Sequence, residues 1–348
     1  MDLLVLAGSF VLILIGAELF TNGIEWFGRK LGLAEGAVGS VLAAVGTALP
    51  ETMIPIIAIG FSADAASSGI GVGAILGAPF MLATLAMFVT GVAVLWQARH
   101  RPAGDLMPVD VEVLGLDMRT FAIAYGLAIG AAFLPADPTW PKLIAGAGLV
   151  LIYVLYVKRH FEADPEVDLD DLAPLRFRHL DLRQRRVPGP PRLRVVNIQV
   201  LAALAFIIVG AVAFVGAVEH VAQALGVSEV LLALIVAPIA TELPEKFNSI
   251  IWVRQGKDTL AMGNITGAMV FQASLPTVVA LVLVPREWVI GPGSYVAFAS
   301  AGIAFLSSAA IFIPMIRRGR LTGRGLLWGG AFYLAYLTLV VGAILRPA

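Results

Sequence analysis

The stretch APIATELPEKFNS, residues 237–249, places two glutamates and a lysine inside a segment that is otherwise apolar. The surrounding run, from about residue 228 to 252, is long enough to cross a hydrocarbon core of about 30 Å. Ionisable side chains at that depth are costly, and the default interpretation of such residues is functional. The purpose of Glu242, Glu245 and Lys246 is therefore the first question that the sequence poses.

Composition assigns the chain to the polytopic membrane proteins. The 348 residues are 59% hydrophobic and only 14% charged, a balance that soluble domains of this length do not show. The formal net charge is zero, which argues against a nucleic-acid partner. Because cysteine is absent, a metal ion would need oxygen ligands or the four histidines. We expect inorganic cations and the lipid bilayer as partners, no cofactor, and no obligatory protein partner.

Ten apolar runs predict an all-α membrane fold with ten transmembrane helices. Their approximate limits are 3–27, 37–59, 69–96, 118–134, 140–157, 195–218, 228–252, 258–284, 289–315 and 326–345. The basic residues test this layout independently. With the N-terminus outside, twenty of the 24 lysines and arginines face the cytoplasm, and only Lys142, Arg286 and Arg346 face outward. We therefore expect an integral protein of the cell membrane with both termini outside.

The stretch around Glu245 has a close copy earlier in the chain. Shifted by 194 residues, GAELFTNGIEWFGRKLGLAEGAVGSVLAAVGTALPE (16–51) aligns without gaps on GAVAFVGAVEHVAQALGVSEVLLALIVAPIATELPE (210–245). A second block, GVGAILGAPF (71–80), aligns on AMGNITGAMV (261–270) at a shift of 190. Five helices, an odd number, separate the copies. The second half must therefore enter the membrane from the opposite side, as in inverted-repeat transporters.

The repeat predicts the domain organisation. Residues 1–157 form the first five-helix repeat and residues 195–348 the second. Residues 158–194 between them carry many charges and the run VPGPP, which is typical of a solvated linker loop on the cytoplasmic side.

The motif shared by the two copies combines three kinds of oxygen ligand. A proline lacks an amide proton, which frees the carbonyl one helical turn earlier. A glutamate follows that proline, and a threonine lies four residues before the glutamate on the same helix face. Hard cations such as calcium prefer these oxygens. The candidate ligands are the side chains of Glu51, Glu245, Thr47 and Thr241 and the carbonyls of Gly46 and Ala240. For the threonines, a hydrogen bond to their own helix is the competing interpretation.

These motifs resemble those of the sodium/calcium exchanger family of cation antiporters, whose two repeats carry GTSxPE followed by a GNxxGSNxxN-like motif. GTALPE (46–51) and ATELPE (240–245) are similar to the first motif, and GAILGAPFML (73–82) and GNITGAMVFQ (263–272) to the second. The resemblance implies a ten-helix inverted-repeat fold. It implies calcium binding by Glu51 and Glu245 and sodium binding assisted by the motif threonines. It also adds three candidate ligands in the second half, namely Asn264, Gln272 and Ser249.

The chain departs from the family pattern mainly in its first half. Apolar residues there replace polar ones that the family commonly has, namely Ala48, Pro55, Ala78 and Leu82, and Ala268 does so in the second half. The first half-site should therefore be the drier of the two. Fewer hydroxyl groups weaken the expectation of the usual three-sodium stoichiometry, and they weaken the assignment of calcium as the substrate more than the assignment as an antiporter.

In the alignment of the two copies, the positions of Glu242 and Lys246 are occupied by Ala48 and Thr52 in the first copy. This charged pair therefore belongs to the second half alone. Their i, i+4 spacing predicts an ion pair on one helix face. Alternatively, Lys246 competes as an internal cation for Glu245 or Glu242, which is itself a candidate ligand. A lysine that titrates in this way would couple transport to protons.

We therefore predict a secondary-active cation antiporter, not an enzyme, that exchanges calcium for sodium by alternating access at a midplane site built on Glu51 and Glu245. One alternative is a cation/proton exchanger. Others are a membrane-embedded hydrolase with paired acidic residues and a protein that binds ions without transporting them. The histidines are expected in loops or at helix ends, without the spacing of metal ligands, at His100, His160, His179 and His220.

Overall fold

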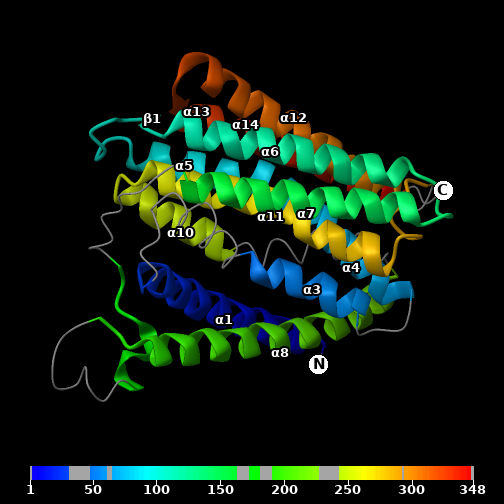
Figure 1. Cartoon of the computed structure of the whole chain (residues 1–348). Coiled ribbons are helices and arrows are strands. Elements are labelled where there is room, and N and C mark those ends of the chain that lie inside the picture. Colours follow the sequence, from blue (N-terminus) through cyan, green and yellow to red (C-terminus); the bar gives the residue numbers. More distant parts are fainter. Residues whose placement is uncertain are drawn as a thin grey trace.

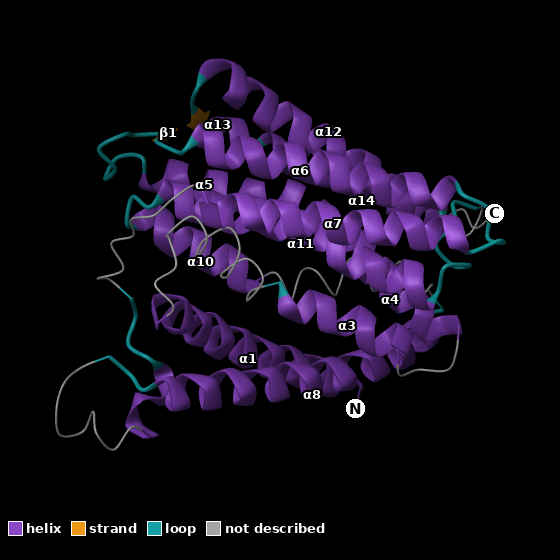
Figure 2. Cartoon of the chain, viewed as in Figure 1, coloured by secondary structure: helices purple, strands orange, loops and turns teal. Residues whose placement is uncertain are grey.

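The fold was obtained as a computed structural model, which describes residues 2–30, 48–60, 65–162, 172–180, 190–226, 243–291 and 294–345. Helices dominate these residues (Figure 2). In chain order the elements are α1 (Asp2–Lys30), α3 (Leu49–Gly60), α4 (Ala65–Met81), the π-helix η2 (Leu82–Ala86), α5 (Met87–Gln97), β1 (Leu106–Met107), α6 (Val111–Gly130), η3 (Ala131–Phe133), α7 (Trp140–Glu162), η4 (Arg176–Leu180), α8 (Leu193–Leu225), α10 (Leu243–Arg254), α11 (Asp258–Leu283), α12 (Tyr295–Arg318), β2 (Leu321–Thr322), α13 (Gly323–Leu326) and α14 (Trp328–Leu345).

Eight helices in the described part of the chain are long and apolar enough to cross a membrane. They coincide with eight of the ten predicted spans. The other two, 37–59 and 228–252, are described only in their second halves, as α3 and α10, so the total of ten remains a prediction. Large apolar side chains cover the outer surface, including Leu4, Trp96 and Phe133, which are 78%, 84% and 75% exposed. Such a surface fits lipid and would aggregate in water.

Several predicted helix limits differ from the structure. Helix α8 ends at Leu225 instead of about residue 218, and α12 begins at Tyr295 instead of about residue 289. Helix α6 begins at Val111 instead of about residue 118, because the Asp110 side chain caps it by accepting hydrogen bonds from the backbone amides of Glu112 and Val113. Helix α7 continues to Glu162 instead of ending at about residue 157. Asp117 and His160 therefore lie inside helices.

Helices α1 and α8 form a long pair along one side of the molecule, and the remaining helices form a thicker bundle (Figure 1). Glycines allow the pair to approach closely. A Cβ atom on Gly16 would lie 2.8 Å from Ile207 Cγ1, and one on Gly210 would lie 2.7 Å from Ile13 Cγ1. Gly16 and Gly210 are equivalent at the repeat shift of 194, and so are Ile13 and Ile207. The contact is thus reciprocal.

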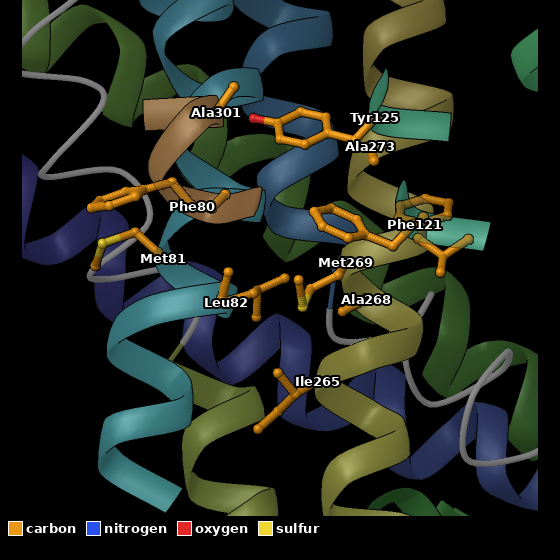
Figure 3. Close-up of a cluster of buried hydrophobic side chains, with 14 of the residues drawn as sticks. Phe80, Met81, Leu82, Phe121, Tyr125, Ile265, Ala268, Met269, Ala273 and Ala301 are labelled. Carbon is orange, nitrogen blue, oxygen red and sulfur yellow. The ribbon is translucent and has the colours of Figure 1, made fainter. Parts of the chain in front are cut away.

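The main core lies between α4–η2, α6, α11 and α12, with Leu82, Phe121, Tyr125 and Met269 among its side chains (Figure 3). The two helices that carry the second block are buried alike. From 71 to 92 and from 261 to 282, each position has the same burial class as its equivalent at the shift of 190. Both segments therefore occupy the same kind of central position in the bundle.

One end of the bundle gathers basic residues and is called the basic end below. It holds the last turns of α1, α7, α10 and α12, on the left in Figure 1, which carry Arg29, Lys30, Arg159, Arg254, Arg317 and Arg318. At this end a buried bidentate ion pair joins Arg101 to Asp258, and Arg101 Nη1 also donates to Val253 O at 2.7 Å. The loop after α5 is thereby tied to the corner between α10 and α11.

Candidate functional site

The two short helices α3 and α10 begin at the shared motif. Each has 12 residues, and the two coincide exactly when shifted by 194 residues. In the view of Figure 1 both helices begin near the middle of the molecule and run from there to opposite ends, and both pack against α11. Glu51 and Glu245 lie in the first turn of α3 and α10, where the amide dipoles of a helix favour a negative charge.

Gln272, in the middle of α11, reaches the beginning of α3. Its Nε2 donates to the carbonyl oxygen of Ala48 at 3.4 Å, which bridges the two halves of the chain. Its Oε1 is buried and has no hydrogen-bond partner within the described structure. A buried acceptor of this kind requires an explanation, and a bound cation provides one, because amide oxygens are ligands for hard cations.

The other candidate ligands with described side chains belong to α10 and α11. Asn264 is fully buried on α11, and Ser249 is fully buried on α10. The Ser249 hydroxyl donates to the carbonyl oxygen of Ala261 at 3.1 Å, so it joins the two helices while its oxygen can still accept. Lys246 is 5% exposed and follows directly after Glu245.

Several predicted ligands cannot be compared with the structure. The residues in question, Thr47, Thr241, Gly46, Ala240 and Glu242, lie outside the described residues. For Glu51 and Glu245 the backbone is described but the side chain is not. Among the side chains that are described, no three acidic or histidine residues lie close enough together to hold a metal ion. The site built on two glutamates therefore remains a prediction.

The half-sites on α4 and α11 differ in polarity. From Ile70 to Ala83, every residue of the first-half helix is apolar or glycine, and all are buried. Thr84 follows, but its hydroxyl donates to Phe80 O at 2.6 Å within the same helix. The equivalents of Asn264 and Gln272 are Ala74 and Leu82. Of these two equivalent segments, the described side-chain oxygens at the centre thus belong to α11.

A second group of buried polar side chains lies nearer the basic end, and sequence reasoning missed it. Asp117 of α6 is fully buried, and its Oδ1 accepts a hydrogen bond from Tyr156 Oη of α7 at 2.9 Å and lies 2.9 Å from His160 Nε2 of the same helix. Its Oδ2 forms a short hydrogen bond with Thr266 Oγ1 of α11. We call these four residues the Asp117 cluster.

His160 lies in the last turn of α7, at a helix end as one of the two predicted alternatives had it, and not in a loop. Its side chain is buried, with only 2% exposed. One sequence signal for the Asp117 cluster was available. Tyr156 and His160 are spaced i, i+4, so they share one face of α7. A polar stripe of this kind near the end of a membrane helix predicts a polar partner on a neighbouring helix.

Comparisons with known proteins agree with this architecture. Residues 1–159 and 196–345 match the protein family described as "Sodium/calcium exchanger protein". The chain is 25% identical over 340 residues to "Putative antiporter CaxA" of Alkalimonas amylolytica, covering 94% of each chain. It is 20% identical over 262 residues to the uncharacterized membrane protein MJ0091 of Methanocaldococcus jannaschii, covering 75% of this chain and 74% of that one.

Two solved structures show the same fold. The crystal structure of the H+/Ca2+ exchanger CAX superposes with a TM-score of 0.76 at 15% identity and covers 100% of this chain and 82% of that one. The sodium-calcium exchanger NCX_Mj, soaked with 2.5 mM Na+ and 1 mM Sr2+, superposes with a TM-score of 0.62 at 16% identity and covers 97% of both chains.

Proposed function

The chain belongs to the sodium/calcium exchanger family, and we propose from this premise that it is a secondary-active antiporter that exchanges calcium for sodium by alternating access. It is a transport protein rather than an enzyme, since its named relatives are antiporters and exchangers. The observation that carries the proposal is the unsatisfied Oε1 of Gln272 on α11, whose Nε2 reaches the beginning of α3. Helices α3 and α10 both begin at the shared motif and both pack against α11.

In the proposed site, Glu51 and Glu245 neutralise a divalent cation. Gln272 and Asn264 would add amide oxygens from α11, and Ser249 a hydroxyl from α10. The carbonyls of Gly46 and Ala240 and the hydroxyls of Thr47 and Thr241 complete the ligand set. Calcium takes six to eight oxygen ligands in flexible geometry, so a set drawn from both halves suits it.

Alternating access in the proposal depends on two inverted halves. The reciprocal packing of Gly16 and Gly210 supports this arrangement, because a two-fold axis makes each contact occur twice. The matching burial of 71–92 and 261–282 supports it as well. The proposal places both termini outside the cell and the linker 158–194 in the cytoplasm, which agrees with basic residues gathering at one end.

A proton is the second candidate for the counter-ion, and two observations favour it. The helix from Ile70 to Ala83 has no side-chain oxygen to offer to sodium. Lys246 is buried beside Glu245, where a change in its protonation would alter the net charge of the site. Glu242, its expected partner, remains a candidate ligand in either case.

Calcium-45 uptake by proteoliposomes tests both versions. For the first version we expect uptake to follow an outward sodium gradient and to disappear in Glu51→Gln and in Glu245→Gln. The matched control is Glu112→Gln, an exposed glutamate at the beginning of α6, whose replacement should leave uptake unchanged. Uptake that is driven by an outward proton gradient but not by a sodium gradient would show that the counter-ion is the proton and not sodium. If the wild-type protein moves no cation under either gradient, the antiporter proposal is wrong.

A further inference from the structure

The Asp117 cluster places an ionisable carboxyl group and an imidazole inside the bundle, near the basic end, where α7 has its last turn. Asp117 is 0% exposed and His160 is 2% exposed. The cluster joins three helices, because Asp117 comes from α6, Tyr156 and His160 from α7, and Thr266 from α11. Buried ionisable groups in a membrane protein are expensive, which makes a purely structural purpose for this pair a costly solution.

The neighbouring charges do not neutralise the pair. On α6 and α7 the charged side chains of Glu112, Arg119, Lys158 and Arg159 are exposed, and Arg317 and Arg318 of α12 are exposed in its last turn. On α11, Asp258 is engaged by Arg101. The phenol of Tyr156 donates to Asp117, and Tyr153 on the same helix packs against Tyr156 and Phe271. Within the described structure, the charge of this cluster is therefore set by Asp117 and His160.

The hydrogen bonds of Thr266 allow Asp117 to exist with or without a proton. Thr266 Oγ1 lies within hydrogen-bond distance of Asp117 Oδ2 and also 3.0 Å from Met262 O, but a hydroxyl group has only one proton to donate. When Asp117 is ionised, Thr266 donates to its Oδ2. When a proton binds to Oδ2, the new carboxylic O–H donates to Thr266 Oγ1, and the hydroxyl rotates to donate to Met262 O. The proton leaves a hydronium ion or a buffer acid in solution, one carboxylic O–H bond forms, and no covalent bond within the protein breaks. In both states the hydroxyl of Thr266 and the carboxyl group of Asp117 have partners for their protons.

Thr266 connects this cluster to the motif helix. It lies within GNITG, two residues after Asn264, and its equivalent in the first half is Leu76. Thr266, the residue that the second half contributes to the cluster, therefore has no hydroxyl counterpart in the first half. A rotation of the Thr266 hydroxyl changes what holds α11 against α6, two residues from a candidate ligand.

We propose that Asp117, together with His160, forms a proton-binding site that regulates ion exchange through Thr266 and α11. The ligand is a proton from the side of the basic end. The site is distinct from Glu51 and Glu245 and does not require the proton to be the exchanged ion. Only the link to transport rests on the proposed function.

Infrared difference spectra of the full-length protein in lipid test proton binding directly. On acidification we expect the carbonyl band of a protonated carboxylic acid that is missing from Asp117→Asn. The band should shift in Thr266→Val, which lacks the hydroxyl partner, and stay in place in Thr266→Ser, which keeps it. Glu112→Gln is the control for an exposed carboxyl group. A spectrum of Asp117→Asn identical to that of the wild type would overturn the proposal.

The pH profile of calcium uptake tests the link to transport. If proton binding at Asp117 regulates exchange, uptake should depend on pH, and we expect the wild-type rate to change at least about threefold between about pH 5 and 8 and that of Asp117→Asn less than about 1.5-fold. Thr266→Val should shift the profile and Thr266→Ser should restore it. Profiles of Asp117→Asn and Thr266→Val that match the wild type would contradict the link. If the wild type transports no cation, the proposed function fails, and the infrared result alone still decides whether the site binds a proton.

Discussion

Gln272 is a buried amide with one unsatisfied oxygen, so its replacement should separate ion binding from stability. In Gln272→Leu, the site loses an oxygen ligand, and we expect the calcium concentration for half-maximal uptake to rise about tenfold, since a hydrogen bond or ligand to a charged group contributes about 1.5–3 kcal/mol. The melting temperature in detergent should stay unchanged or rise, because the variant no longer buries an unpaired polar atom.

Ser274→Ala is the matched control for Gln272→Leu. Ser274 is also fully buried on α11, but its hydroxyl donates to Val270 O at 2.7 Å within the helix. We expect its removal to leave calcium affinity within about twofold, because such local bonds contribute little to the helix. If Gln272→Leu lowers the melting temperature and leaves the affinity unchanged, Gln272 serves packing and does not bind the ion.

At the scale of single residues, functional candidates could be predicted from the sequence where the repeat duplicates them, and were missed where it does not. Glu51 and Glu245 could be singled out because each has an equivalent in the other half. Asp117 has no polar partner among its immediate neighbours in the sequence. Its partners lie on α7 and α11 and reach it only when three helices pack together. The predicted start of its helix at about residue 118 also placed it in a loop, where a solvated aspartate is common and does not indicate a functional site.

At the scale of elements, the reciprocal contact between α1 and α8 predicts matched effects of two substitutions. Gly16→Ala and Gly210→Ala would each place a methyl group within 3 Å of an isoleucine on the opposite helix. Inserting a methyl group into tight packing costs about 1–3 kcal/mol, so we expect both variants to unfold at lower temperature and by similar amounts. Thermal unfolding in detergent, followed by intrinsic fluorescence, measures the difference.

The controls are Gly8→Ala on α1 and Gly216→Ala on α8, where an added Cβ atom meets nothing within 4 Å. These variants should be neutral or slightly more stable, because alanine has the higher helix propensity. Equal destabilisation by all four substitutions would show that the cost arises within each helix and not in the contact between them.

The eight described spans were predictable because length and apolarity suffice to identify a membrane helix. Their ends were less predictable, since a cap such as Asp110 acts through local hydrogen bonds that hydropathy does not register. The difference mattered for function. The turns that α6 and α7 gain at the basic end are those that carry Asp117 and His160.

At the scale of the whole molecule, the two halves share a framework and differ in chemistry. The shift of 194 residues aligns α3 with α10, while polar side chains concentrate on α11 and are missing from the equivalent segment Ile70 to Ala83. In transporters built from inverted repeats, both halves take part in alternating access, but the ion site does not need equal contributions from both. The asymmetry is therefore where ion selectivity and its regulation are expected to reside.

The orientation of the molecule can be measured directly because the chain contains no cysteine. We expect Arg286→Cys to react with a membrane-impermeant thiol reagent in intact cells, and Arg318→Cys to react only after permeabilisation. Both side chains are exposed and lie near opposite ends of the bundle, with Arg318 at the basic end. Replacing Arg286 removes only an exposed ion pair with Asp137, which contributes little to stability. The opposite labelling pattern would show that the orientation in the membrane is the reverse of the proposed one. The Asp117 cluster would then lie toward the outer face and exchange protons with the exterior.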